Sequence, residues 1–463
     1  MYLSIDKKDV NAIAMRDCTG AQVSYGEIVA FSNAFLGVVK ERCLIFVLST
    51  NCIGAAMGYL GAMINRVVPL MLAASMDQEL LAELIRIYEP AYIWKPLSMV
   101  EDGEEVIYKE YQYALISTGR KGYPMYEDLS LLLTTSGSTG SPKLVRHSYE
   151  NLEAQARNIS AFFEMDGTER PMLDLPINYT MGLSVLNSHL YAGATVLLTS
   201  MNALNPKYWE FLKTNQATSL TNVPYYYEIL KKLRFFRMDL PYLKMISQGG
   251  GRLSDELYKE CAEYAHNTGR KFIPTYGQTE GSARMAYLPA EFARKKCGSI
   301  GKAIPNGKLY LVDEEGNRIT KPDTIGEMVY EGPNVTLGYA VCGEDLILGD
   351  ERKGILYTGD MVKMDEDGFF YIVGRKKRFL KLWGYRVGLD ECENILKSAF
   401  DVECACVGDD SCMKIYVTTE RGHDEMKRYI ADKTNINSSA FQICYIESIP
   451  RNEAGKILYS KLE

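Results

Sequence analysis

The stretch Leu131-Leu-Leu-Thr-Thr-Ser-Gly-Ser-Thr-Gly-Ser-Pro-Lys143 joins an apolar run, which predicts a buried strand, to a loop made almost wholly of Gly, Ser and Thr. Gly137 and Gly140 let the backbone approach a ligand closely, while hydroxyl groups, backbone N–H groups and Lys143 suit a polyphosphate. It is not a Walker A loop, because Pro142 stands where that pattern needs Gly. A flexible linker is the alternative, but linkers rarely follow a buried strand directly and end in Pro-Lys. The stretch therefore predicts a phosphate-binding loop.

The composition predicts a soluble, globular protein of two domains. The chain has 463 residues, of which 47% are hydrophobic and 24% charged, and this length exceeds one ordinary domain. A net charge of −7 argues against wholesale nucleic-acid binding. No apolar stretch is long and charge-free enough to span a bilayer.

The cysteines predict a reducing compartment. Eleven cysteines occur without any Cys-x-x-Cys pair, and the first residues lack the apolar segment of a signal peptide. A scattered, odd-numbered set is typical of reduced thiols, so the expected location is cytoplasmic. Cys404 and Cys406 are expected on one face of a strand, and the four histidines are too dispersed for an evident metal site.

Alternating strands and helices predict an α/β fold in the first part of the chain. Strands are expected at Leu44–Leu48, Leu129–Leu133, Thr195–Leu198, Leu243–Ile246 and Phe272–Thr275, with helices such as Tyr208–Asn215 and Asp255–His266 between them. From Asn306 the pattern predicts hairpin-rich β structure, with strands at Lys308–Val312, Gly326–Tyr330 and Gly368–Val373.

The tail predicts a small α+β domain. It is read as helix, strand, helix and strand at Asp390–Phe400, Lys414–Thr419, Asp424–Lys433 and Gln442–Ile446. We therefore expect a large N-terminal α/β domain of layered sheets and helices with a β-rich subdomain, residues 1–376, and a small mobile α+β domain, residues 377–463.

Two further stretches place chemistry at strand ends. Phe272-Ile-Pro-Thr-Tyr-Gly-Gln-Thr-Glu280 supplies an aromatic ring that stacks on a base, a hydroxyl group for a phosphate and a carboxylate for Mg²⁺. Ser247-Gln-Gly-Gly-Gly251 leaves room for a flat ligand or permits a tight turn. The alternative for the first stretch is a Gly turn capped by polar residues.

Three segments near the C-terminus are weaker evidence for a functional role when each is taken alone. Tyr357-Thr-Gly-Asp360 offers a carboxylate for two ribose hydroxyls, or a plain Asp in a turn. Gly374-Arg-Lys-Lys-Arg-Phe-Leu-Lys-Leu-Trp-Gly-Tyr-Arg-Val387 is a solvated basic face or a nucleic-acid patch by composition. Pro450-Arg-Asn-Glu-Ala-Gly-Lys456 ends in a lysine that is ordinarily a surface residue.

Taken in order, these stretches resemble the motifs of the adenylate-forming superfamily: acyl-CoA synthetases, luciferases and adenylation domains of nonribosomal peptide synthetases. The resemblance runs from Leu131 to the C-terminus, and fewer residues match the family patterns before Leu131. It implies catalytic roles for Lys456, Thr279 and Glu280, with Glu280 on Mg²⁺. It implies ATP binding by Thr135, Ser136, Gly137, Ser138, Thr139, Gly140, Lys143, Gly249, Gly250, Tyr276, Asp360 and Arg375.

The resemblance also implies an acyl pocket and a hinge. The pocket residues are Tyr179, Ser184, Val223, Gln248 and Gly249, and Tyr179 is aligned with its family position to within one residue. Amino-acid-activating members carry an Asp at the position of Tyr179, and no acid lies within Pro176–Leu186, so an α-amino acid is disfavoured. Lys377 falls on the pivot, and Lys381 and Gly384 on the face that meets the thiol.

The expected reaction is ATP-dependent activation of a carboxylic acid to acyl-AMP and pyrophosphate, followed by acyl transfer to the pantetheine thiol of coenzyme A or an acyl carrier protein. This makes the chain an AMP-forming acid–thiol ligase. The alternatives are a stand-alone amino-acid-activating enzyme and a non-catalytic nucleotide-binding relative. No Gly-x-Ser-x-Gly elbow supports a hydrolase.

Overall fold

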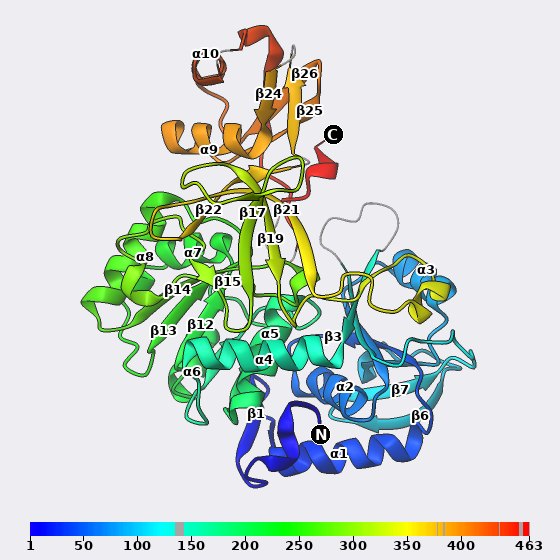
Figure 1. Cartoon of the computed structure of the whole chain (residues 1–463). Coiled ribbons are helices and arrows are strands. Elements are labelled where there is room, and N and C mark those ends of the chain that lie inside the picture. The colour runs from blue at the N-terminus through cyan, green and yellow to red at the C-terminus, as the bar shows by residue number, and fades with distance from the viewer. Residues whose placement is uncertain (135–142, 377, 383–384, 435, 453–456, 463) are drawn as a thin grey trace.

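The computed structural model describes residues 1–134, 143–376, 378–382, 385–434, 436–452 and 457–462. Within these ranges, one sheet lies on the left of Figure 1. From edge to edge its strands are β16 (Lys302–Ala303), β15 (Ala286–Tyr287), β14 (Lys271–Tyr276), β13 (Met245–Gln248), β12 (Ser219–Asn222), β10 (Pro171–Leu173), β11 (Val196–Leu198), β1 (Ile13–Asp17) and β2 (Gln22–Ser24).

A second large sheet lies on the right of Figure 1. Its order is β20 (Gly338–Ala340), β9 (Leu144–Ser148), β8 (Leu129–Thr134), β4 (Val68–Ala73), β3 (Leu44–Ser49), β5 (Tyr92–Pro96), β7 (Tyr113–Ser117) and β6 (Glu105–Glu110). The strands β5, β3, β4 and β8 are parallel neighbours, and β3, β4 and β8 are largely apolar and buried, as expected for strands covered on both faces.

Helices between the two sheets form the main core. The N-terminal domain has the helices α1 (Tyr25–Val38), α2 (Ile53–Ile64), α3 (Gln78–Tyr88), α4 (Tyr149–Phe163), α5 (Thr180–Ala192), α6 (Pro206–Thr214), α7 (Pro224–Lys232) and α8 (Asp255–Asn267). Apolar side chains of α1, α2 and α5 pack with those of β3 and β11 in one cluster, which joins the two sheets. Ser148 caps α4 reciprocally with Asn151, so the helix begins where β9 ends.

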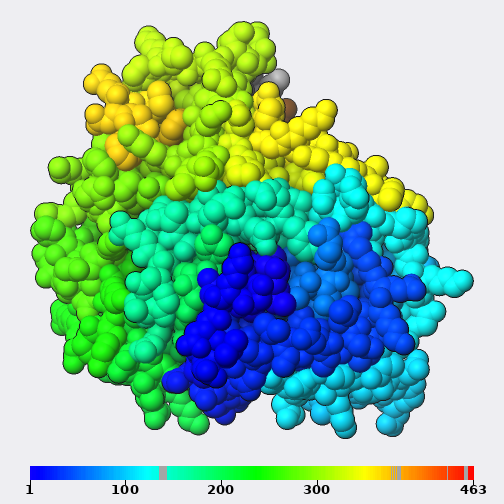
Figure 2. Space-filling model, turned by 60° about the horizontal axis from the view of Figure 1, so that its bottom comes forward, coloured from blue at the N-terminus to red at the C-terminus, as the bar shows by residue number. Residues whose placement is uncertain are grey.

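The described residues also form short 3₁₀ helices: η1 (Tyr2–Lys7), η2 (Leu97–Met99), η3 (Phe235–Arg237), η4 (Thr279–Gly281), η5 (Ala290–Phe292), η6 (Gly343–Ile347), η7 (Ser438–Ala440) and η8 (Tyr459–Lys461). The first of them, η1, packs against α1, α4 and α5. Its dark-blue atoms lie at the centre of the underside of the molecule (Figure 2), so the N-terminal segment covers the junction of the two sheets.

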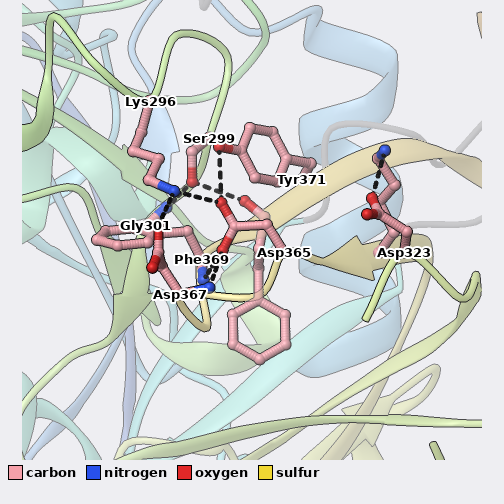
Figure 3. Close-up of polar contacts among 10 residues, drawn as sticks. Lys296, Ser299, Gly301, Asp323, Asp365, Asp367, Phe369 and Tyr371 are labelled. Carbon is pink, nitrogen blue, oxygen red and sulfur yellow. Dashed lines mark hydrogen bonds and ion pairs between the residues drawn. The ribbon is translucent and has the colours of Figure 1, made fainter. Parts of the chain in front are cut away.

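A β-rich sheet lies above the two large sheets in Figure 1. Its order is β18 (Arg318–Ile319), β17 (Lys308–Val312), β19 (Gly326–Glu331), β21 (Ile355–Met364) and β22 (Phe370–Arg375). Lys296 ties it to the large domain by ion pairs with Asp365 at 2.8 Å and Asp367 at 2.5 Å (Figure 3). The Ser299 hydroxyl adds a 2.9 Å hydrogen bond to the Phe370 carbonyl.

The C-terminal part is a small α+β unit at the top of Figure 1. It contains β23 (Phe379–Leu382), β24 (Tyr385–Gly388), α9 (Leu389–Phe400), β25 (Cys404–Asp409), β26 (Cys412–Val417), α10 (His423–Thr434) and β27 (Phe441–Tyr445). Cys404 and Cys406 share one buried face, as predicted, while Ala405 and Val407 pack on the other. The unit meets the β-rich sheet where α9 contacts β22.

The fold class predicted from the sequence is confirmed, and most element bounds agree within two or three residues. All eleven cysteines are free thiols. In the part of the chain that is described, no helix combines the length and the apolar character needed to cross a membrane.

Candidate active site

The candidate site lies at the carboxyl ends of three neighbouring parallel strands in the left-hand sheet. In the register, Asn222 of β12 pairs with Gln248 of β13, which pairs in turn with Pro274 of β14. The predicted pocket residue Val223, the glycines after Gln248 and the turn after Tyr276 therefore meet at this edge. Ligands of α/β proteins bind at such carboxyl edges.

Met181 of α5 packs closely against the glycines that follow β13. A Cβ at Gly249 would lie 2.8 Å from Met181 Cε and 2.8 Å from Thr275 Oγ1. Gly250 has a φ of +78°, and its Cβ would lie 3.2 Å from both Met181 and Val223. The Gln248 side chain turns back on this loop and donates to the Gly251 carbonyl at 2.6 Å. Glycine is needed here because the backbone is left-handed and the first turn of α5 is close.

The turn after β14 holds Thr279 and Glu280 in a fixed position. A Cβ at Gly277 would lie 1.4 Å from the Ala283 carbonyl oxygen, so the turn closes on itself. Thr279 Oγ1 lies 3.3 Å from Thr180 Oγ1 at the start of α5. The motif on β14 and the first turn of α5 thus face each other across the sheet edge.

Asp360 is the centre of a buried hydrogen-bond cluster. Its Oδ2 accepts from the Tyr276 hydroxyl and, at 2.9 Å, from Gln278 Nε2. Its Oδ1 lies 3.2 Å from Nε of Arg375, whose side chain is 60% exposed. Burial, together with the Asp360 carboxylate, raises the pKa of Tyr276 well above its ordinary value and keeps the phenol a donor. The structure therefore brings together Tyr276, Asp360 and Arg375, which the sequence assigned to one site.

Glu280 and Lys143 also meet, through Tyr339. The Tyr339 hydroxyl donates to Glu280 Oε1 at 2.8 Å, and Lys143 Nζ lies 3.3 Å from the centroid of the Tyr339 ring. The Arg352 guanidinium lies 4.5 Å from the same centroid. Burial and the nearby Glu280 carboxylate raise the pKa of Tyr339 to about 12. A carboxylate and two cations are thus gathered around one phenol.

Gln278, Tyr339, Arg352 and Thr180 join the site without having been predicted from the sequence. Arg284, four residues after Glu280, is a fifth. Its guanidinium is buried and donates to Ser184 Oγ at 2.8 Å, so it lies beside a predicted pocket residue on α5. Tyr179, another predicted pocket residue, is the half-buried N-cap of α5. The signal for Arg284 is its place four residues after the end of the Tyr-Gly-Gln-Thr-Glu stretch.

Several predicted residues lie outside the described ranges: Thr135, Ser136, Gly137, Ser138, Thr139, Gly140, Lys377, Gly384 and Lys456. Lys381 lies on β23, and its side chain is not described. On either side of the lysine stretch, Arg451 and Ile457 form a bridge, and the Arg451 guanidinium lies 5.3 Å from the ring of Tyr225 on α7. The last motif therefore begins beside the helix that follows Val223.

Comparisons with known proteins identify the family. Residues 6–340 match the AMP-binding enzyme family. Indoleacetate–CoA ligase of Aromatoleum aromaticum is 29% identical over 354 residues, which cover 71% of this chain but 65% of the relative, just under two thirds of its length. 2-Succinylbenzoate–CoA ligase of Bacillus mycoides is 29% identical over 349 residues, covering 73% of this chain and 70% of the relative.

Solved structures share the fold over the whole chain. o-Succinylbenzoate CoA synthetase of Bacillus subtilis, in complex with its acyl-adenylate intermediate, superimposes with a TM-score of 0.78 at 20% identity, covering 100% of this chain and 97% of that one. ATP-bound MatB of Rhodopseudomonas palustris gives a TM-score of 0.81 at 21% identity, with the same coverage. With the family match extending over most of its length, this chain belongs to the AMP-binding enzyme family.

Proposed function

We propose that this protein activates a carboxylic acid with ATP and transfers the acyl group to a pantetheine thiol. One carboxylate oxygen attacks the α-phosphorus of ATP, the bond to the β-phosphate oxygen breaks, and pyrophosphate leaves. The thiol then loses its proton and attacks the acyl carbonyl, and AMP leaves. The observation that carries the proposal is the single sheet edge at which the Asp360 cluster, the Thr279–Glu280 turn and the start of α5 meet.

The Asp360 cluster supports a nucleoside site. A carboxylate is a natural acceptor for two vicinal ribose hydroxyls, and Asp360 is held in place by Tyr276 and Gln278. Arg375 pairs with the remaining carboxylate oxygen, but its side chain is mostly exposed and can move when ribose binds. Gly249 and Gly250 follow β13, the strand next to that of Tyr276, and we assign them to the site of the base. We assign ATP binding to this group, together with the 135–143 loop.

Glu280 fits Mg²⁺. It is a carboxylate with one oxygen held by Tyr339, and such oxygen donors are the ligands that Mg²⁺ prefers. Bound Mg²⁺ supplies positive charge that offsets the charge of the phosphate oxygens. Lys143, whose Nζ lies over the Tyr339 ring, is positioned to add a second positive charge from the protein. Thr279 is assigned to the α-phosphate.

We assign Lys456 to the first half-reaction. Between the two half-reactions, we assign to the C-terminal unit a rotation that replaces Lys456 at the site by the face that meets the thiol. The proposed boundary is at residue 377. Lys376 is bound to the β-rich sheet through Glu327 at 2.7 Å, while Arg378 is bound to the C-terminal unit through Glu393 at 2.9 Å. A pivot between these two anchors lets Lys456 leave and Lys381 and Gly384 approach, as lid motions in other enzymes do.

The acyl acceptor and the location complete the proposal. Coenzyme A is favoured, because the relatives with similar sequences are named CoA ligases; an acyl carrier protein is the second candidate. A cytoplasmic location stays a prediction, consistent with free thiols. The test is hydroxamate-trapped adenylation with a panel of carboxylic acids, followed by thioester formation with coenzyme A. Acyl hydroxamate from at least one acid supports the proposal, and none from any acid would contradict it.

A further inference from the structure

Arg284 is a buried cation whose charge has no counter-ion in the described part of the chain. It is 2% exposed, and its Nε and Nη2 have no hydrogen-bond partner among the described residues. Nη1 donates to Ser184 Oγ at 2.8 Å, and the guanidinium carbon lies 5.4 Å from the Phe163 ring. Burial lowers the pKa of Arg284 to about 10, which leaves it charged at neutral pH.

A second buried arginine shows how this fold satisfies such a group when the role is structural. Arg146 is 0% exposed, yet its Nη2 lies 2.5 Å from Glu351, and its Nε donates to the Tyr339 carbonyl at 2.9 Å. Nη1 donates to the Gly349 carbonyl at 3.2 Å. An isolated buried charge is costly, so buried cations normally have such partners. Arg284 departs from that pattern at the candidate acyl pocket.

A small cavity lies between α4 and α5, the two helices at the centre of Figure 1, and two hydrogen-bond partners of Arg284 line it. Ser184, which accepts from Arg284, lines it, and so does Gln155, which donates to the Arg284 carbonyl at 2.9 Å. The remaining polar lining comes from Thr180, Asn187 and Ser282. The cavity has a volume of about 10 Å³, which is about the room that one water molecule needs, so a compact polar group enters only when the lining side chains move, and a long alkyl chain does not fit.

One lining residue of the cavity lies next to the reacting end of the proposed site. Thr180 lines the cavity and lies 3.3 Å from Thr279, which is assigned to the α-phosphate that the reacting carboxylate attacks. Ser184 lies one turn further along α5, about 6 Å along the helix axis. A substrate that contacts Thr279 at one end therefore reaches Ser184 and Arg284 with a group only a few bonds away.

We propose that Arg284 pairs with a second carboxylate of the acid substrate, so that the enzyme selects compact dicarboxylic acids over the matching monocarboxylic acids. This inference rests on the proposed function and specifies its substrate class. The unpartnered Nε and Nη2 form a planar pair of donors, which matches the two oxygens of a carboxylate. Gln155 Oε1 and Asn187 Oδ1, also unpartnered among the described residues, are acceptors that suit a hydroxyl group or water nearby.

The test is ATP–pyrophosphate exchange with matched acids: succinate, glutarate and adipate against butanoate, pentanoate and hexanoate. The variants are Arg284→Met, which keeps the volume and removes the charge, and Arg270→Met as a control. Arg270 donates to the Leu240 and Leu243 carbonyls, at 2.8 Å each, near the opposite end of β14. Thermal unfolding with and without each acid is measured on all three proteins.

In the wild type and in Arg270→Met, kcat/KM for the best dicarboxylate is expected to exceed that for its matching monoacid by about 10²-fold or more, since a site built for a polar group rejects analogues that lack it. Arg284→Met should remove this preference and the dicarboxylate-induced rise in Tm. Equal use of both series by the wild type, or a preference that survives in Arg284→Met, would overturn the role of Arg284 and leave adenylation standing. If no acid of either series supports exchange, the dicarboxylate inference fails; adenylation itself fails only if the broad hydroxamate panel is also negative.

Discussion

Lys376 and Arg378 are separated by one residue, yet they are bound to different parts of the molecule. Lys376 Nζ lies 2.7 Å from Glu327 Oε2, and its backbone N–H donates to the Gly359 carbonyl at 2.7 Å, both in the β-rich sheet. Arg378 donates to Glu393 Oε1 at 2.9 Å and to the Cys406 carbonyl at 2.8 Å, both in the C-terminal unit. We therefore propose that the pivot between the two units lies between these two anchors.

Lys377→Pro is expected to leave acyl-AMP formation nearly intact and to block transfer to the thiol. Proline fixes φ and removes a donor, so a pivot at this position can no longer turn. Pyrophosphate exchange measures the first step, and thioester formation from preformed acyl-AMP measures the second. Lys377→Ala, which keeps backbone freedom, is the control and should transfer normally. Normal overall turnover in the proline variant would place the hinge elsewhere.

Lys456→Ala is expected to reduce adenylation by about 10²–10³-fold, the usual cost of removing one preorganised charge from a reacting centre. Thioester formation from preformed acyl-AMP should be largely unaffected, because the lysine is assigned to the first step only. Rapid-quench measurement of each half-reaction separates the two. An equal loss of rate in both half-reactions would contradict the assignment of Lys456 to the first step alone.

Glu280→Gln is expected to raise the Mg²⁺ concentration needed for half-maximal adenylation, since a neutral amide is a poorer ligand for a hard cation. Tyr339→Phe removes the phenol that holds Glu280 Oε1 and keeps the carboxylate, so it should have a smaller effect in the same direction. A Mg²⁺ titration of the initial rate measures both variants. An unchanged Mg²⁺ dependence in Glu280→Gln would remove this residue from the metal site.

Gly277→Ala is expected to destabilise the protein and to abolish adenylation, because its Cβ would lie 1.4 Å from the Ala283 carbonyl oxygen. The turn must open to admit it, which costs about 1–3 kcal/mol or more and displaces Thr279 and Glu280. Gly37→Ala, at a helical position with nothing within 4 Å, is the matched control and should be tolerated. A Gly277→Ala protein with wild-type Tm and activity would contradict the geometry of the turn.

The fold was predictable where apolar runs and turn residues repeat, as at β3, β8 and β14. The strands β15, β16 and β20 were not, because two or three residues are too short to carry a period and form only by pairing with neighbours. The motifs placed Tyr276 and Asp360 in one site, but not their direct contact, since sheet pairing brings together residues that are 84 positions apart. Nothing local in Ser-Ala-Arg-Met indicates that Arg284 is buried; its burial follows from the packing of α4 and α5.

Adenylation of a carboxylic acid can be measured as acid-dependent exchange of labelled pyrophosphate into ATP. We expect exchange with at least one non-amino carboxylic acid, and none with standard α-amino acids, because a buried ammonium group near Tyr179 would lack a counter-ion. We also expect Tyr179→Ala to change the acyl preference while the KM for ATP moves little. Exchange with α-amino acids alone would contradict the proposed substrate class, and exchange with no acid at all would contradict the proposed adenylation.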